Sequence, residues 1–289
     1  MDKVFESSQS GLIESCVSYP NNQRNTVGGY VKNILSKLKE EKDKNLFQTW
    51  GLLENGGYIK DGKIIWPTYD TNQFGFRSDE WCHKNHFASS NGEKGAIFLG
   101  CSDVAGTGNY YENTAAYIVS KELGVNNYNL GYPGGGLDQC YRVLKYHITK
   151  INAEHVFLLV PESFRREIFS DTASVLLSTF ALEDGITAEQ LGVDTTALQK
   201  VYLEYMCDPT YVNLHTNKNL DAIEHLCNKS GMKLHIVKNP IYYKDKKERY
   251  TFKNMLSGLI ESQIDMAADL EHFGKNFQKK IANLLLEKL

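Results

Sequence analysis

Short apolar segments alternate with helical segments through most of the chain, and this alternation constrains the fold more than any other feature of the sequence. Four segments have the length and composition of buried strands: residues 96–99, 127–130, 156–160 and 234–237. Helices are predicted near 113–123, from about residue 138, up to Gly231 and over about 274–289. Strands that alternate with helices form a parallel sheet covered on both faces. We therefore expect an α/β protein with a three-layer α/β/α arrangement.

The chain divides into three parts by pattern. Residues 1–50 form an N-terminal extension, residues 51–90 hold a hairpin and a preamble, and residues 91–289 hold the α/β domain, with a largely helical insertion at about 170–206. The hairpin is predicted at Asp61-Gly62, a dipeptide typical of tight turns. The extension contains a predicted amphipathic helix, because apolar residues recur there at helical spacing: Val31, Ile34, Leu35 and Leu38. Such a helix would pack on the main domain; alternatively, residues 1–50 are a candidate for a homo-oligomer or assembly contact.

Composition and charge exclude several classes of protein. Lys and Arg number 32 and Asp and Glu number 35, so the net charge is −3 and gives no basic field for nucleic acid or an anionic membrane. No segment is long and apolar enough to span a bilayer, and the N-terminus has neither the basic start nor the apolar block of a signal peptide. We expect a cytoplasmic protein, or a virion-associated one if the source is viral, with no nucleic-acid partner and no membrane span.

The cysteines give no sign of a metal site or a disulfide framework. They are scattered and form no C-x-x-C pair: Cys16, Cys82, Cys101, Cys140, Cys207 and Cys227. We interpret them as reduced, mostly buried thiols and expect neither a metal ion nor an organic cofactor.

The loops that follow the strands are the places to look for chemistry, because ligands of parallel sheets bind beyond the carboxyl ends of the strands. Ser102 comes just after the first strand and is flanked by glycines, which is how a nucleophilic hydroxyl is presented. The alternative is that Ser102 only caps the helix that follows. The same loop lacks the Lys of a phosphate-binding loop, so nucleotide binding is disfavoured.

A nucleophilic serine needs a base, and the base needs an acid that orients it. His272 precedes the last helix, and Asp269 lies three residues before it, with Asp265 as a reserve acid. The alternative is an exposed loop acid beside an exposed loop histidine. Glycines over 131–136, after the second strand, could direct backbone N–H groups at an oxyanion or form only a flexible turn.

These segments together resemble the SGNH hydrolases, the GDSL-type esterase superfamily. Residues 98–103, with two glycines soon after, are similar to the first block of that family, residues 129–134 to its second, and residues 269–274 to its last. Residues 72–77 are similar to a preamble found in some members. The resemblance implies a flavodoxin-like sheet, a triad of Ser102, His272 and Asp269, and an oxyanion hole formed by the N–H groups of Ser102 and Gly134. Gly135 and Gly136 are alternative donors.

The third block departs from the family. The family has Gly-x-Asn-Asp after the third strand, whereas this chain has residues 161–167, Pro-Glu-Ser-Phe-Arg-Arg-Glu, with no asparagine. Ser163 and Arg165 are the candidates to replace the missing donor or to contact the substrate. The alternative is that Arg165 and Arg166 pair with the neighbouring glutamates on a helix surface.

The resemblance implies a serine esterase that hydrolyses a small ester, such as an O-acyl group on a carbohydrate, through an acyl-enzyme. An O-acyltransferase would use the same triad with a different acceptor. The competing hypothesis is a catalytically reduced SGNH-like module that binds glycans or serves in a virion or surface complex.

Overall fold

The computed structural model describes residues 59–60, 63–64, 76–77, 94–169, 174–177, 194–238, 265, 267 and 272–289. The N-terminal extension 1–50 and its predicted amphipathic helix lie outside these residues. The predicted hairpin is confirmed: β1 (Ile59–Lys60) pairs antiparallel with β2 (Lys63–Ile64), with Ile59 opposite Ile64.

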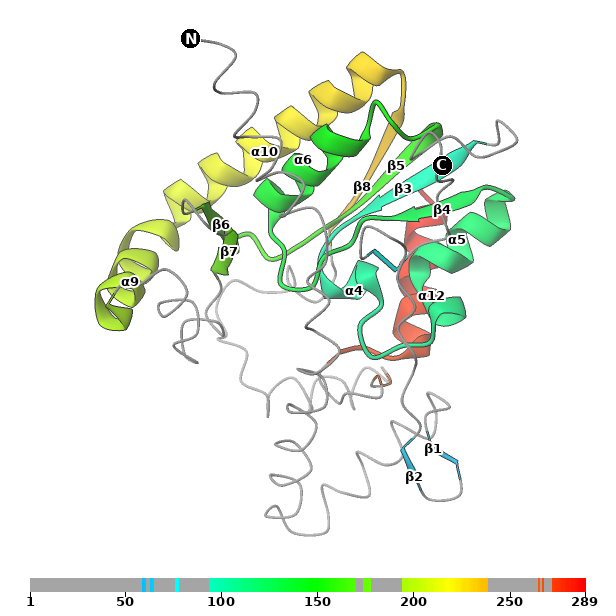
Figure 1. The fold of residues 1–289 in the computed structure, drawn as a ribbon, viewed down its shortest axis with the longest axis horizontal. Coiled ribbons are helices and arrows are strands. Elements are labelled where there is room, and N and C mark those ends of the chain that lie inside the picture. The colour runs from blue at the N-terminus through cyan, green and yellow to red at the C-terminus, as the bar shows by residue number, and fades with distance from the viewer. Residues whose placement is uncertain are drawn as a thin grey trace.

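A four-stranded parallel sheet forms the centre of the protein (Figure 1). Its strands match the four segments predicted from the sequence: β3 (Gly95–Leu99), β4 (Asn126–Asn129), β5 (Ala153–Val160) and β8 (Lys233–Lys238). Their spatial order is β4-β3-β5-β8, and all neighbouring pairs are parallel. The chain therefore passes from one side of β3 to the other after β4, which puts the topological switch point between the carboxyl ends of β3 and β5.

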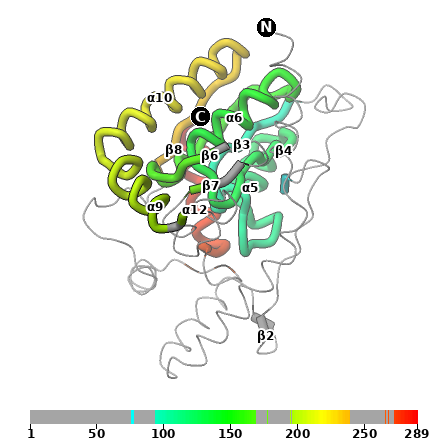
Figure 2. The backbone as a smooth tube through the Cα atoms, turned by 60° about the vertical axis from the view of Figure 1, so that its left-hand side comes forward, coloured from blue at the N-terminus to red at the C-terminus, as the bar shows by residue number. Residues whose placement is uncertain are grey.

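Helices cover both faces of the sheet, so the three-layer α/β/α arrangement is confirmed. On one face α6 (Leu137–His147) and α10 (Pro209–Ser230) pack on Ile97 and Leu99. On the other face α5 (Ala115–Leu123) and α12 (Lys275–Leu286) pack on Ala96 and Phe98. Successive residues of β3 point to opposite faces, as the twofold period of a strand requires, so each face has its own apolar core. Figure 2 shows α6 and α10 side by side on one side of the molecule.

Local signals end these helices where the sequence predicts. Gly231, with φ of +70°, follows the last residue of α10, and its N–H donates to the carbonyls of Cys227 and Asn228. At the start of α10 the Asp208 carboxylate accepts from the amides of Thr210 and Tyr211. The predicted stop at Gly231 is thus confirmed.

The segment around 170–206 differs from the largely helical insertion predicted there. A second hairpin opens it: β6 (Arg166–Phe169) pairs antiparallel with β7 (Ser174–Leu177). Helix is described only later, in α9 (Thr195–Val201) and in the π-helix Tyr202–Met206. Of the described residues in this segment, 174–177 are therefore strand and 195–206 are helical.

Candidate active site

Ser102 lies immediately after β3, as the first residue of the short helix α4 (Ser102–Ala105). The residue is buried, with an exposed fraction of 5 %. Within the described part of the chain, neither its hydroxyl nor its backbone N–H has a hydrogen-bond partner. The first N–H groups of a helix have no partner inside the helix, so Ser102 offers both a hydroxyl and an adjacent N–H to a ligand. A side-chain cap for α4, the alternative role, is not formed by this serine.

Cys101 precedes Ser102 and is the competing nucleophile. Its thiol is buried, with Sγ 3.7 Å from Asp103 Oδ2. Burial, and then the nearby Asp103 carboxylate, raise the pKa of Cys101 to about 11. The side chain is therefore an un-ionised thiol at neutral pH, and a thiol is a poor nucleophile compared with the thiolate. Ser102 is the better candidate.

The loop after β4 lies directly on the Ser102 helix. Asn129 Nδ2 donates to the carbonyl of Val104 at 2.7 Å, and Asn129 Oδ1 accepts from the N–H of Gly131 at 2.9 Å. A Cβ atom on Gly131 would stand 2.5 Å from the amide nitrogen of Ala105, so only glycine allows this approach. Further along, Gly134 adopts a φ of +78°, and its N–H has no partner among the residues that the structure describes.

The loop after β5 lies close to the loops after β3 and β4. Arg165 Nε lies 2.9 Å from Glu162 Oε2, and both side chains are at most 14 % exposed. The two charges have opposite effects on the pKa of Cys101: Arg165 lowers it and Glu162 raises it. The ion pair therefore lies close to the first loop. A Cβ atom on Gly136 would stand 2.7 Å from the Arg165 carbonyl, which shows how closely the second and third loops pack. Ser163, half-buried, lies in the same turn.

The predicted pairing of the two arginines on a helix surface is only partly correct. Arg165 does pair with Glu162, but in a buried turn. Glu167 pairs with Arg142 instead, at 2.6 Å, and Arg166 turns inward. The reason is that residues 166–167 belong to β6, where successive side chains point to opposite faces.

The His272 segment packs against the first loop. Asn109 Nδ2 donates to the carbonyl of Phe273 at 2.9 Å. The buried Gln278 donates to the Asp103 carbonyl at 2.9 Å and accepts from the N–H of Ala115 at 2.8 Å. His272 itself is half-buried, and its carbonyl accepts from Ala267. The structure therefore brings the segment of the predicted base to the helix that Ser102 begins.

Of the two candidate acids, the structure describes only Asp265. Asp269 lies outside the described residues. The carboxylate of Asp265 is buried and accepts from the amides of Asn276 and Phe277 at the start of α12. Burial raises the pKa of Asp265, while those backbone hydrogen bonds oppose the rise. Asp265 thus accepts hydrogen bonds from the first turn of α12. The role of Asp269 as the triad acid stays a prediction.

Two polar side chains that sequence reasoning missed help to build this site. Gln278 lies on the buried side of α12 with Phe277 and Ile281, and a polar residue within that apolar stripe is the signal that could have identified it. Arg77, from the preamble, donates from Nη1 to the Gly106 carbonyl at 2.6 Å and so supports the end of α4.

The described residues contain no group of three or more His, Cys, Asp or Glu side chains arranged to hold a metal ion. Nor does any helix in this part of the chain have the length and apolar character needed to cross a membrane.

The sequence matches no protein-family model and shows no significant similarity to a curated protein. Any assignment of function therefore depends on the motifs and on the geometry described above.

Proposed function

We propose that this protein is a serine hydrolase of the SGNH type that cleaves an ester bond. The observation that carries the proposal is the position of Ser102 and its lack of hydrogen-bond partners among the described residues. Ser102 follows β3 beside the topological switch point, and both its hydroxyl and its N–H lack partners among the described residues. The loop after β4 and α12, the helix that His272 precedes, both reach the short helix that Ser102 begins. The fold thus brings the candidate nucleophile, the donor loop and the segment of the candidate base toward one another from separate parts of the chain, and acyl transfer needs these groups together.

In the proposed reaction Ser102 Oγ forms a bond to the ester carbonyl carbon, and its proton passes to His272. The tetrahedral intermediate collapses, the bond to the alkoxy oxygen breaks, and the alcohol leaves with the proton from His272. Water then attacks the acyl-enzyme, gives its proton to His272, and the acid departs as Ser102 recovers the proton. Asp269 orients the imidazole throughout. Each step conserves charge and needs no redox partner.

The oxyanion of that intermediate would be held by the N–H groups of Ser102 and Gly134. A single oxyanion donor is worth about 100- to 1000-fold in rate, so the third loop matters although it has no asparagine. Ser163 and Arg165 are the side chains that could act there or contact the substrate. Because Glu162 neutralises Arg165, we favour an uncharged substrate such as a small ester or an O-acylated glycan. Transfer of the acyl group to a second hydroxyl would use the same residues.

The missing asparagine also favours a second candidate function. Without that donor the domain could serve as a catalytically reduced module that binds glycans or takes part in an assembly. The low exposure of Ser102, 5 %, is consistent with this alternative. Reactivity of Ser102 decides between the two.

Covalent labelling with a fluorophosphonate, read by intact mass, tests the proposal. We expect one label per chain, lost in Ser102→Ala and in His272→Ala. The matched controls are Ser120→Ala, a buried serine on α5, and His225→Ala, an exposed histidine on α10, which should both label like the unmodified protein. Full labelling of Ser102→Ala would contradict the assignment. A folded protein that does not react would favour the binding module.

A further inference from the structure

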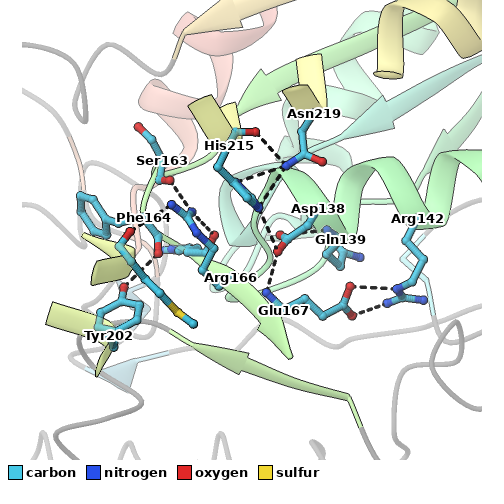
Figure 3. A network of polar contacts seen from close by, with 12 residues as sticks. Asp138, Gln139, Arg142, Ser163, Phe164, Arg166, Glu167, Tyr202, His215 and Asn219 are labelled. Carbon is cyan, nitrogen blue, oxygen red and sulfur yellow. Dashed lines mark hydrogen bonds and ion pairs between the residues drawn. The ribbon is translucent and has the colours of Figure 1, made fainter. Parts of the chain in front are cut away.

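Arg166 is a buried cation that forms no ion pair at contact distance with the carboxylates that the structure describes. Its exposed fraction is 3 %, and no carboxylate of the described residues lies within ion-pair distance of its guanidinium. The guanidinium instead donates to main-chain carbonyls: Nη1 to Ser163 at 2.6 Å and to Arg165 at 2.8 Å, and Nη2 to Met206 at 3.2 Å. Figure 3 shows Arg166 reaching the Ser163 carbonyl, while the next residue along, Glu167, pairs with Arg142.

A charged group is costly to bury, because a desolvated charge loses several kcal/mol of hydration. Arg166 is compensated by three main-chain carbonyls, by the Tyr211 ring, whose centroid lies 5.4 Å from the guanidinium carbon, and by electrostatic interaction with the Asp138 carboxylate. Two of the three carbonyls belong to the turn after β5. The hydrogen bonds of the guanidinium therefore tie this turn to the side chain of Arg166.

Three successive carbonyls of that turn accept hydrogen bonds from side chains. Arg166 binds those of Ser163 and Arg165, and the hydroxyl of the buried Tyr202 donates to that of Phe164 at 3.0 Å (Figure 3). Tyr202 and Met206 both belong to the π-helix, a distortion that occurs frequently at functional sites. These three carbonyls are thus bound by side chains from the start of β6 and from the π-helix.

This attachment determines where the N–H groups point. In a planar trans peptide the C=O and N–H bonds point in opposite directions. Because the Ser163 carbonyl points at Arg166, the N–H of the same peptide, which belongs to Phe164, points away from the guanidinium. That N–H has no hydrogen-bond partner within the described residues. The third loop therefore has a main-chain donor available to a ligand.

We propose that Arg166 is a positioning residue for the reaction at Ser102. It orients the turn after β5 so that the Phe164 N–H, together with Ser163 and Arg165, meets the bound substrate, and so compensates for the asparagine that the third block lacks. The inference rests on the proposed function, since it assigns Arg166 a part in the same reaction.

The test compares two charge-conserving variants, Arg166→Lys and Arg142→Lys. Each replaces the planar fork of an arginine with a single ammonium. Arg166 is buried and Arg142 is partly buried, but only Arg166 contacts the turn carbonyls. The readouts are the second-order rate of fluorophosphonate labelling at Ser102, normalised to folded protein by near-UV circular dichroism, and hydrogen exchange of the peptide covering 161–169. We expect Arg166→Lys to label about 10- to 100-fold more slowly, as misplacement of a reacting group by about 1 Å does, and to exchange faster at 161–169. Arg142→Lys should label within about twofold of the unmodified protein.

A third variant separates positioning from general damage to the fold. Arg166→Ala should label more slowly still, and guanidinium ion at tens of millimolar should restore part of the rate, whereas the same concentration of sodium ion should not. Unchanged labelling in both Arg166 variants would overturn the proposal, as would an equal loss in Arg142→Lys. If the unmodified protein does not label, the proposed function fails. The hydrogen exchange of residues 161–169 then decides whether Arg166 holds the turn, and unchanged exchange in Arg166→Lys would overturn that role too.

Discussion

At the scale of single residues, burial controls the ionisation of His147. His147, at the end of α6, has no exposed surface and packs edge-on against Phe76 and Tyr146. Desolvation, followed by the charges of Lys150 and Arg142, lowers the pKa of His147 to about 3. The imidazole is therefore neutral in the folded protein over the whole physiological range.

This buried histidine predicts a loss of stability in mild acid. The unfolded chain takes up a proton at His147 below about pH 6.5, whereas the folded protein does so only near pH 3. Stability is complete above pH 6.5 and falls as the pH drops toward 3, by up to about 1.4 kcal/mol per pH unit from this group alone. Urea unfolding at pH 7.5 and 5.5 measures the slope. In His147→Gln the average slope over this interval should decrease by about half a proton, which is about 0.7 kcal/mol per pH unit. An unchanged slope would contradict the assignment.

At the scale of elements, α12 is joined to the Ser102 loop by one buried amide. Gln278 bonds to the Asp103 carbonyl and the Ala115 N–H, which connects α12 to both α4 and the start of α5. Its side chain lies among apolar residues, so neither partner has water available as a substitute.

Removal of this amide should loosen the docking of α12. Gln278→Ala removes the hydrogen bonds that this side chain makes to two buried main-chain groups. Each such loss costs about 1 to 3 kcal/mol, so we expect a loss of about 2 to 6 kcal/mol in the free energy of unfolding. Because His272 lies just before α12, Ser102 labelling should slow as well. The control is Lys279→Ala, at the exposed neighbouring position, which should change stability by less than about 0.5 kcal/mol. An equal effect of both substitutions would rule out the specific role of Gln278.

At the scale of the whole molecule, the sheet order brings together loops that are far apart in the chain. The loops after β3, β4 and β5 meet because these strands are neighbours and parallel. Gly136 marks the contact between the second and third loops, since a Cβ atom there would lie 2.7 Å from the Arg165 carbonyl.

Gly136→Ala should therefore push the two loops apart and slow Ser102 labelling by at least about tenfold, since small displacements of reacting groups have effects of this size. The control is Gly124→Ala, at the end of α5. Its Cβ would meet nothing within 4 Å, but its φ of +64° makes alanine unfavourable by about 1 kcal/mol. We expect the Gly124 variant to be less stable yet to label normally. Normal labelling of Gly136→Ala would mean that the contact between the loops does not matter for the reaction.

The sequence by itself determined the features that depend on neighbouring residues. Short apolar segments of strand length predicted the four strands, and Gly231 predicted the end of its helix. Ser102 and Gly134 are candidates because they follow predicted strands. Such signals are local, since they depend on backbone conformation and on which side of an element faces the core.

Only the tertiary structure decided how the charged and amide side chains are paired. Arg165, Arg166 and Glu167 are adjacent in sequence, yet the first pairs with Glu162, the second binds main-chain carbonyls, and the third pairs with Arg142. Nothing in their spacing distinguishes these outcomes. The partner of a buried polar group is chosen by which distant segment the folded chain brings within about 3 Å of it, and that proximity is a property of the whole fold.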